Sequence, residues 1–418
     1  MTKKIVLIFS ALFLCSSLFA QEHMSPRQWA NAADVANSKK DYPTAIADYQ
    51  QAINGGYSNF GLLYSLACVY SLQNNSEQAL LALEKSAAMG LRSASILQNE
   101  SDLNPLHSDP HWAKIVAIVT KNEQAYHVTH NDPNGFKFVT SDIDLFWKTY
   151  DQLPTAADPA LLWERNYLDR GTVGLQGFIF SRIQSGEFLN KMIQSESKFY
   201  AGIRKNTLQT ASVEPRVRTA LRKFKSLYPE ANFPDVYFVI GNSGTGGTST
   251  NDGLVVGTEI FSLSADVPID ELNDWQKSVI KTPDLLPSIV IHELMHFQQN
   301  YDSPEMLASV IKEGAADFLA SLVVDGNFNQ RIYDYGYVHE AELKQQFLLD
   351  MKKNDATHWL YNGGSAKGSP ADLGYFMGFR ITQAYYQRAT DKKQAVVDIL
   401  NINDFNAFVA QSGYFDGK

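Results

Sequence analysis

The chain has 418 residues, which is enough for two or three domains, and 44% of them are hydrophobic, which suffices for a sizeable core. A formal net charge of -9 speaks against a nucleic-acid partner. The acidic balance also gives no sign of a polybasic membrane-binding surface, so we expect a globular protein.

The N-terminus reads MTKKIVLIFSALFLCSSLFA, with two lysines before an apolar run and Ala20 before a polar residue. This pattern predicts a secretory signal peptide over residues 1–20, cleaved after Ala20. The apolar run is too short for a comfortable span, which favours export to the periplasm or the medium over a membrane anchor. Cys15 offers a lipid-attachment site, but Leu14 before it is too bulky for the usual lipobox, so lipid anchoring is not expected. No later segment predicts a transmembrane helix.

The next segment carries an internal repeat. DYPTAIADYQQAINGG, from Asp41, aligns with NSEQALLALEKSAAMG, from Asn75, and Gly56 corresponds to Gly90, at an offset of 34 residues. This is the period of the helix-turn-helix tetratricopeptide unit. We therefore predict an α-helical, tetratricopeptide-like repeat domain over residues 21–125. Its groove would bind a peptide or protein partner, or the array would serve only as a spacer, and the sequence leaves both open.

A polar stretch, HVTHNDPNGFKF, marks the boundary before a second domain over residues 136–418. Helical spacing dominates this domain, but VYFVIG, from Val236, and GLVVGTEIFSL, from Gly253, are rich in β-branched and aromatic residues and predict strands. The intervening NSGTGGTSTND lacks the lysine of a nucleotide-binding loop and predicts a flexible hairpin connection. The expected fold class is α+β, with helical repeats followed by a mostly helical domain that holds a small sheet.

The segment IHELMHFQQ predicts a metal site. Residues 288–299 favour a helix, which places His292 and His296 on one face, one turn apart, so that both imidazoles can reach one ion. Glu293 points to an adjacent face, from which it could reach a metal-bound water. Composition alone would produce such a motif in roughly one in a hundred chains of this kind.

A third ligand is expected from the helix predicted in SVIKEGAADFLASLV, where Glu313 and Asp317 are four residues apart. One carboxylate can ligate Zn²⁺ while the other hydrogen-bonds a ligand histidine. We expect Glu313 to be the ligand. Two alternatives remain: a pair of core histidines without metal, and a zinc site that is no longer catalytic.

HELMHFQQ followed by KEGAADF resembles the gluzincin class of metallopeptidases. More narrowly, the chain is similar to a family of predicted bacterial zinc-dependent proteases, related to a lipoprotein family of gliding motility. GGTSTNDGLVVGTE and GYFMGF, from Gly374, also match that family, and the resemblance covers roughly residues 136–400. Phe379 stands where the family has tyrosine. The short spacing from His296 to Glu313 leaves Asp317 as a reserve ligand.

The resemblance implies an exported zinc metallopeptidase that hydrolyses a peptide or protein substrate through a zinc-activated water. Glu293 would be the general base and Tyr375 the donor to the oxyanion. Weaker candidates for that donor are His339, His358 and Arg380. The strand from Gly253 could present its edge to an extended peptide. Glu259 on this strand is expected to be a solvated carboxylate.

A rival interpretation is a non-catalytic periplasmic binding or scaffold protein that uses the repeats to capture a partner and keeps a structural zinc site. The intact Glu293 favours the enzyme, because a structural site has no need of a general base.

Overall fold

The computed structural model describes residues 24–244, 246–250, 252–301, 303–363, 366 and 368–416. The chain divides into two compact units, Met1–Thr129 and His130–Lys418, and each has its own hydrophobic core. The division falls inside the polar stretch HVTHNDPNGFKF. The expected signal peptide and Cys15 lie outside the described residues.

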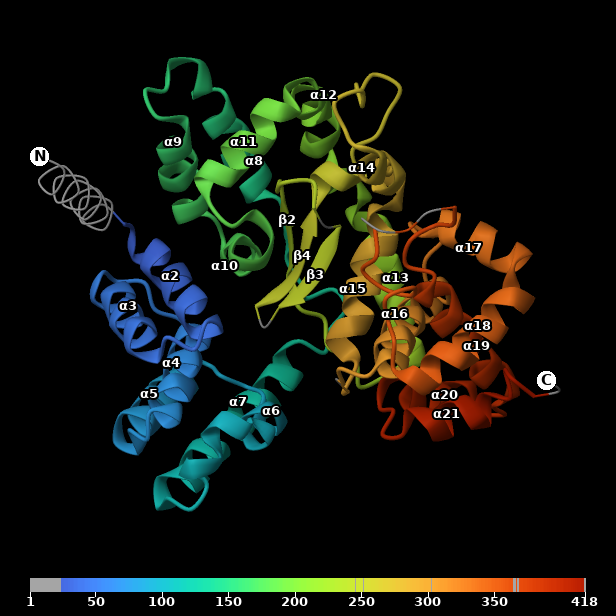
Figure 1. The fold of residues 1–418 in the computed structure, drawn as a ribbon, viewed down its shortest axis with the longest axis horizontal. Helices are drawn as coiled ribbons and strands as arrows, with labels where there is room; N and C mark the ends of the chain where they lie inside the picture. The colour runs from blue at the N-terminus through green and yellow to red at the C-terminus, as the bar shows by residue number, and fades with distance from the viewer. Residues whose placement is uncertain are drawn as a thin grey trace, which may run out of the picture. The chain divides into compact units, whose positions relative to one another are not determined.

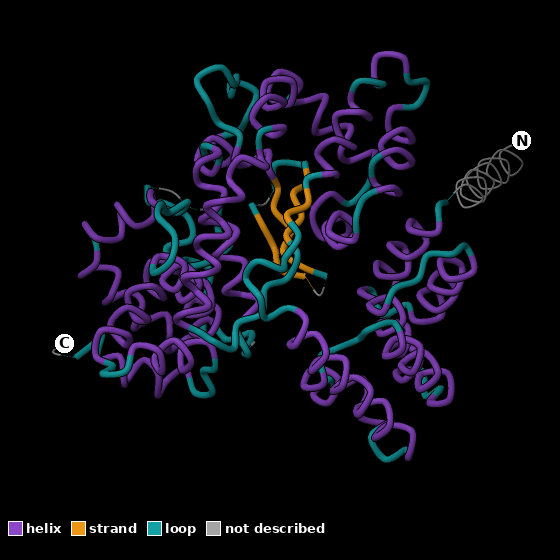
Figure 2. The backbone as a smooth tube through the Cα atoms, turned by 180° about the vertical axis from the view of Figure 1, so that it is seen from behind, coloured by secondary structure: helices purple, strands orange, loops and turns teal. Residues whose placement is uncertain are grey.

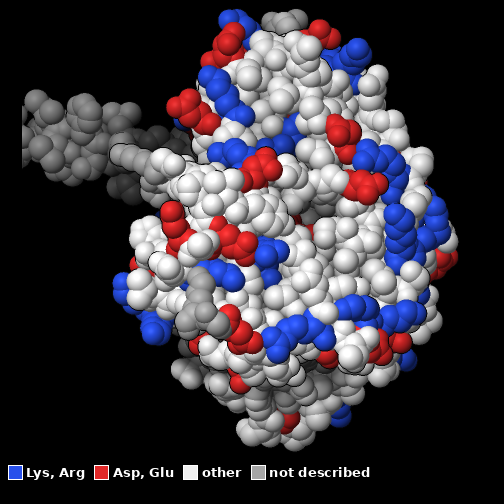
Figure 3. Space-filling model, turned by 90° about the vertical axis from the view of Figure 1, so that its right-hand side faces the viewer, with Lys and Arg blue, Asp and Glu red and all other residues white. Residues whose placement is uncertain are grey.

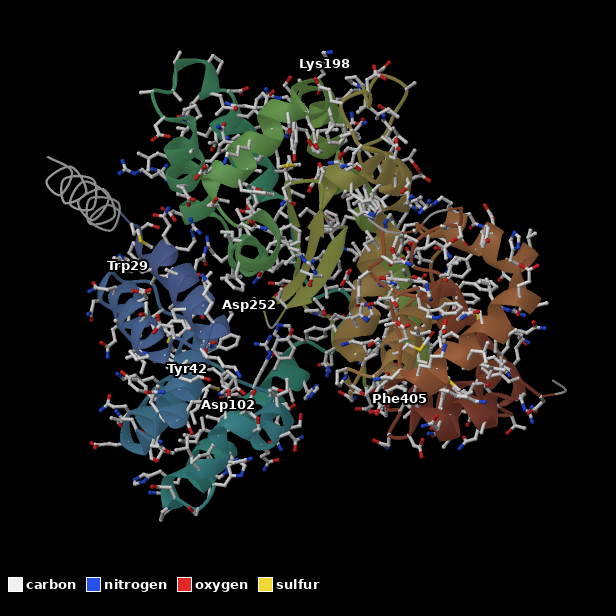
Figure 4. All side chains as sticks on the ribbon, viewed as in Figure 1. Trp29, Tyr42, Asp102, Lys198, Asp252 and Phe405 are labelled. Carbon is white, nitrogen blue, oxygen red and sulfur yellow. The ribbon has the colours of Figure 1, made fainter. Side chains whose placement is uncertain are left out.

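The first unit is built from helices (Figure 1). Their bounds are α2 (Pro26–Ser38), α3 (Tyr42–Asn54), α4 (Phe60–Leu72), α5 (Ser76–Ala88), α6 (Ala94–Asn99), the 3-10 helix η1 (Ser101–Leu106) and α7 (Pro110–Thr129). Helix α2 packs against α3, and α4 packs against α5. Trp29 on α2 and Tyr42 at the start of α3 are partly buried at the edge of this core (Figure 4).

The 34-residue spacing recurs in the helix bounds, since α4 begins and ends 34 residues after α2, and α5 does so after α3. The caps follow the same spacing: the side chain of Asp41 accepts a hydrogen bond from the backbone of α3, and that of Asn75 does so for α5. Gly56 and Gly90 follow α3 and α5 with positive φ angles of 94° and 102°, a conformation that favours glycine. Each pair of helices therefore repeats the same local design.

The second unit combines helices with one small sheet. Its earlier helices are α8 (Ser141–Tyr150), α9 (Pro159–Asn166), α10 (Val173–Phe178), α11 (Gly186–Ser195), α12 (Ser197–Leu208), α13 (Glu214–Leu227) and α14 (Asp274–Val279). Its later helices are α15 (Leu286–Gln298), α16 (Met306–Ser321), α17 (Gln330–Val338), α18 (Glu340–Lys353), α19 (Gly374–Arg388), α20 (Lys392–Leu400) and α21 (Phe405–Ser412). Phe405, where α21 begins, stacks edge-on against Tyr301 (Figure 4). The predominance of helix with a small sheet agrees with the expected α+β class.

The sheet has the strand order β1-β2-β4-β3, with bounds Phe138–Val139, Val236–Val239, Gly253–Gly257 and Gly247–Thr250 in that order. Strands β1, β2 and β4 run parallel, and β3 pairs antiparallel with β4. Every residue of β2 and β4 is buried, which explains their continuous apolar runs. Figure 2 shows the strands enclosed by helices.

Three expectations about the sheet are wrong. The strand expected from Gly253 ends at Gly257 and continues as a 3-10 helix, Thr258–Phe261. This strand is also an inner strand, so its edge is not open to a peptide, and the edge strand is β3.

Strand β3 arises from the segment expected to be a flexible connection. Its glycine, threonine and serine residues carry no hydrophobic alternation, and pairing with β4 alone defines it.

Helices cover both sides of this sheet: α8 and α10 contact β2, whereas α15 contacts β3 and β4 (Figure 1). Helices α16 and α19 cross almost backbone to backbone. A Cβ atom on Gly314 would lie 2.1 Å from the backbone nitrogen of Phe379, and one on Gly378 would lie 2.0 Å from the carbonyl oxygen of Val310. Two glycines therefore set the distance between these helices.

Within the described part of the chain, no helix is both long enough and apolar enough to cross a lipid bilayer. On the face drawn in Figure 3, basic and acidic side chains are interspersed, as the modest net charge of -9 suggests.

Candidate metal centre

The candidate metal centre lies between two neighbouring helices, α15 and α16 (Figure 1). Helix α15 extends to Gln298 without a break, so His292 and His296 lie one turn apart as the sequence predicts. Helix α16 carries Glu313 and Asp317. The packing of α15 on α16 brings the residues of the two motifs together.

Three side-chain atoms converge at this place. Nε2 of His296 lies 3.0 Å from Nε2 of His292 and 3.1 Å from Oε2 of Glu313, and His292 Nε2 lies 3.5 Å from the same oxygen. The two histidines are 3% and 11% exposed and Glu313 is 12% exposed, so little water reaches the three atoms. These are the residues that the sequence proposes as ligands.

Hydrogen bonds on the far side of each ring determine which atoms face the centre. Nδ1 of His292 lies 2.7 Å from the carboxylate of Asp317, and Nδ1 of His296 lies 2.8 Å from the amide oxygen of Gln299. Both partners accept, so each Nδ1 carries the hydrogen and each Nε2 presents a lone pair. Two lone pairs and the carboxylate of Glu313 then face one another, which is unfavourable unless a positive charge lies between them.

The pKa values of His292 and Glu313 also indicate that a positive charge is favoured at the centre. Burial lowers the pKa of the His292 imidazole, but the neighbouring carboxylates of Asp317 and Glu313 outweigh burial and raise it to about 10. Burial would raise the pKa of Glu313, yet the two histidines hold it well below its ordinary value. A proton or a metal cation can supply this charge.

The donor set fits zinc. Tetrahedral Zn²⁺ with nitrogen and oxygen ligands at about 2.0–2.1 Å separates neighbouring ligand atoms by roughly 3.3 Å. The three separations of 3.0, 3.1 and 3.5 Å bracket that value. Two imidazoles and one carboxylate are also ligands that zinc accepts, and they leave a fourth position open.

Asp317 contacts Nδ1 of His292, on the side of the ring that faces away from the three converging atoms, and is not one of those atoms. Its second oxygen, Oδ2, accepts hydrogen bonds from Asn329 Nδ2 at 3.0 Å and from Tyr333 Oη at 2.7 Å. The carboxylate is therefore fixed on both sides and locks the orientation of the imidazole ring. Gln299 does the same for His296, because its amide nitrogen donates to the carbonyl oxygen of Lys312 at 2.8 Å.

Glu293 is buried beside the centre. The backbone of β3 lies directly against it, since a Cβ atom on Gly247 would be 2.7 Å from Oε1 of Glu293. Burial raises the pKa of Glu293, and the two histidines partly offset that rise. A side chain longer than hydrogen at position 247 would displace the carboxylate.

A cavity of about 560 Å³ opens over the centre, and His292, Glu293, His296 and Glu313 are among its lining residues. Tyr375 forms part of the wall, with its ring stacked on His292 at a centroid distance of 6.0 Å. Burial and the nearby carboxylates raise the pKa of Tyr375 well above its ordinary value, so its hydroxyl stays protonated.

Sequence reasoning missed Tyr361, whose hydroxyl donates to Oε1 of Glu313 at 3.2 Å. Tyr361 lies in a loop between α18 and α19, with no periodic pattern that could single it out. The roles of Gln299 and of Asn329 were also missed. The glutamine stands at a fixed spacing after His296, which is a signal that could have been used.

The weaker candidates lie away from the cavity wall. His339 stacks on Tyr335, His358 lies 3.7 Å from Asp350, and Arg380 pairs with Glu340 at 2.9 Å. None of these three is among the residues that line the described cavity. Each side chain is occupied by a partner of its own.

The expectation of a solvated carboxylate at Glu259 is wrong. Its side chain is 1% exposed, and Oε1 accepts a hydrogen bond from the backbone nitrogen of Ser243 at 3.2 Å. Oε2 has no hydrogen-bond partner among the described atoms. Burial raises the pKa of Glu259 to about 7, although backbone hydrogen bonds act in the opposite direction. The residue is buried because the chain after Gly257 turns into a 3-10 helix instead of running on as a strand.

Comparison with known proteins assigns a family. A family model described as "Gliding motility protein GldB" matches residues 166–415, which is more than half of the chain and includes the whole metal centre. No protease or tetratricopeptide family matches. No curated protein and no solved structure matches the chain.

This match corrects several expectations. The assignment to predicted zinc proteases and tetratricopeptide proteins, and the peptidase function with it, is overturned because the matching family is one of gliding motility proteins. Export agrees with that family of envelope lipoproteins, whereas the expectation against lipid anchoring does not. The chain belongs to the family of the gliding motility protein GldB.

Proposed function

We propose that this protein is a non-catalytic, envelope-associated binding protein that contributes to gliding motility. The N-terminal helical unit binds a protein partner, and Zn²⁺ stiffens the second unit at the site of His292, His296 and Glu313. The observation that carries the zinc proposal is the convergence of two imidazole lone pairs and one carboxylate in a buried place. Membership of the GldB family supports the role in gliding.

Zinc in this role cross-links two helices. His292 and His296 come from α15 and Glu313 from α16, so one ion would add a cross-link to the packing and to the His292–Asp317 hydrogen bond that already join the two helices. Asp317 and Gln299 keep the imidazoles in the ligating tautomer. Ligands held in this way reduce the ordering that metal binding requires.

The first unit offers surface for a protein partner. Large hydrophobic side chains are exposed on its last helices and the turn after α5: Leu81, Met89, Ile96 and Ile118 are each between 43% and 57% exposed. Helix α7 contacts both α5 and α6, which places these side chains on neighbouring elements. Apolar groups that remain exposed on adjacent helices favour binding of a partner.

Glu293→Gln tests whether the protein acts without catalysis. The substitution keeps the size of the side chain and removes its capacity to accept a proton, and Glu293 is not one of the three converging ligands. We expect the variant to bind about one zinc per chain and to restore gliding in a deletion strain as well as the wild-type gene does.

His292→Ala and His296→Ala should instead lose zinc and restore gliding poorly. Retained zinc and an unchanged fold, combined with lost gliding in Glu293→Gln, would contradict the non-catalytic proposal, because general-base catalysis alone contributes about 10²–10⁴-fold. Cleavage of a peptide library by the wild-type protein and not by Glu293→Gln would contradict it in the same way.

A further inference from the structure

The cavity over the metal centre carries positive charge that the mechanism of metal binding does not use. Arg182, Lys281 and Arg331 all line it, on three different segments of the second unit. No carboxylate of the described residues lies within ion-pair distance of any of the three. Surface arginines elsewhere in the chain, such as Arg204 and Arg218, do pair with carboxylates.

We propose that this cavity binds an organic oxyanion, a carboxylate or a phosphate ester attached to an apolar body, through Arg182, Lys281 and Arg331. This inference deepens the proposed function, because the cavity belongs to the same metal centre. It adds a small ligand to a protein for which only a metal and a protein partner have been proposed.

Lys281 and Arg331 lie close enough to each other for their positive charges to repel. Burial, together with the positive charge of Arg331, lowers the pKa of Lys281 to about 8. The ammonium group makes one hydrogen bond, to the carbonyl oxygen of Ser278 at 3.0 Å. Two like charges close together in a partly buried place favour an anion between them.

Arg182 adds a buried donor from another part of the wall. Its Nε atom is shielded from solvent and has no hydrogen-bond partner among the described atoms. Burial raises the pKa of both Glu293 and Tyr361, and the positive charge of Arg182 opposes that rise, which places the guanidinium near both side chains. A buried guanidinium donor without an acceptor is costly, and an oxyanion would supply one.

Two of the acidic residues that line the cavity, Glu313 and Asp372, have hydrogen-bond partners of their own. Glu313 faces the two histidines and accepts from Tyr361. Asp372 accepts a hydrogen bond from the backbone nitrogen of Tyr361 at 2.6 Å. Arg331 acts on Asp372 and Arg182 acts on Glu293 through their charge, but neither guanidinium forms an ion pair with a described carboxylate, so both can still donate to a ligand.

The remaining wall fits an apolar body of small-molecule size. Phe261, Trp275, Phe328 and Tyr375 contribute aromatic surface. A volume of about 560 Å³ lies within the range of roughly 300–1,000 Å³ that is usual for small-molecule sites. The ligand is therefore an anion with an aromatic or aliphatic group, and inorganic phosphate alone should bind more weakly.

Isothermal titration of the full chain tests this proposal with four probes: phenyl phosphate, 3-phenylpropionate, the uncharged 3-phenylpropanol and inorganic phosphate. We expect at least one of the two organic anions to bind and 3-phenylpropanol to bind far more weakly. Preference for the phosphate or the carboxylate probe identifies the source of the oxyanion. Arg331→Gln and Lys281→Gln should each weaken binding about tenfold or more, the effect of one charge-assisted hydrogen bond.

Lys277→Gln is the matched control, because Lys277 is exposed, lies four residues before Lys281 and does not line the cavity. Arg331 is also exposed, so Arg331→Gln should fold normally. The proposal is overturned if no organic anion binds, or if Arg331→Gln and Lys281→Gln behave like Lys277→Gln. The second result would mean that the anion only fills the open position on zinc.

Titration of metal-free and zinc-loaded protein separates this inference from the proposed function. Anion binding that persists without zinc and weakens in Arg331→Gln supports the anion site even if the zinc proposal fails. Stoichiometric zinc with no anion binding in either form overturns the anion site and leaves the zinc proposal intact.

Discussion

At the scale of single residues, the proposed metal centre depends on the side chains behind the three converging atoms as much as on those atoms themselves. Asp317 and Gln299 each occupy one Nδ1 atom, and this alone directs both Nε2 atoms to Glu313. With either partner missing, the tautomer that turns an N–H group towards the centre becomes accessible, and it would compete with metal binding.

Removal of a ligand should abolish metal binding, whereas removal of a supporting carboxylate should only weaken it. We expect His292→Ala and His296→Ala to purify without zinc. Glu313→Ala should weaken zinc binding more than Asp317→Ala, which should cost about 10–100-fold in affinity. Zinc content and competition with a chelating dye measure both effects.

His339→Ala is the control, because this histidine pairs with Glu342 away from the cavity. The reverse order, with Asp317→Ala the more damaging change, would make Asp317 the ligand and Glu313 the supporting group.

Glu259 should make stability depend on pH. Its pKa is raised from 4.5 to about 7 in the folded chain, so the folded state favours the protonated form. The stabilising contribution is complete below pH 4.5 and is lost as the pH rises through 7. The free energy of unfolding of the wild type should therefore fall by about 3 kcal/mol relative to Glu259→Gln over this interval.

Denaturant unfolding of metal-free protein at pH 4.5 and pH 8 measures this difference, and omission of zinc removes the pH dependence of metal binding. Equal pH dependence in the wild type and in Glu259→Gln would show that the carboxyl is ionised in the fold without cost.

At the scale of elements, the crossing of α16 and α19 positions the acidic ligand. Gly314 follows Glu313 directly, and its missing side chain lets α19 approach. Tyr375 lies one turn before Gly378 on α19, so the same crossing brings its ring to His292. The crossing of α16 and α19 therefore fixes the positions of both Glu313 and the Tyr375 ring in the cavity wall.

Gly378→Ala should part the two helices, because its Cβ atom would lie 2.0 Å from the carbonyl oxygen of Val310. We expect the free energy of unfolding to fall by about 1–3 kcal/mol. Zinc affinity should fall as well, since Glu313 moves with α16. Gly61→Ala is the control, because the nearest atom to its Cβ is 3.4 Å away, and it should stabilise its helix by up to about 1 kcal/mol.

Unchanged stability and zinc affinity in Gly378→Ala would mean that the helices adjust without effect on the site.

The elements that the sequence predicts well are those with strong periodicity. The spacing of the histidines and of Glu313 and Asp317 is a helical signal, and it survives folding because both helices are long and buried. Strand β3 could not be predicted, because its residues show no alternation and the strand exists through pairing with β4. Tyr361 reaches Glu313 from a loop 48 residues later, a contact that only the tertiary fold creates.

At the scale of the whole molecule, two units with separate cores follow the segment that we predict to direct export. The family assignment favours attachment to the envelope through a lipid, and Cys15 is the residue that could carry it. An anchor at the N-terminus would leave the first helical unit as the part of the chain nearest the membrane along the sequence.

Cys15→Ser should release the protein from the membrane fraction and abolish metabolic labelling with palmitate. Cys68→Ser is the matched control, because Cys68 is buried within α4 and should keep the label and the fractionation of the wild type. Cell fractionation with labelling measures both. A wild-type protein without label, released after cleavage at Ala20, would contradict lipid anchoring and support a soluble exported form.

The two glycines at the crossing of α16 and α19 also affect how the sequences of related chains should be interpreted. The motif KEGAADF joins a residue that packs, Gly314, to the proposed ligand Glu313, and GYFMGF contains the second packing residue, Gly378. A relative that has lost the metal would still need both glycines to bring its helices together. Glycines shared at these two positions therefore indicate a common fold. Only the joint presence of His292, His296 and Glu313 would indicate a common capacity to bind metal.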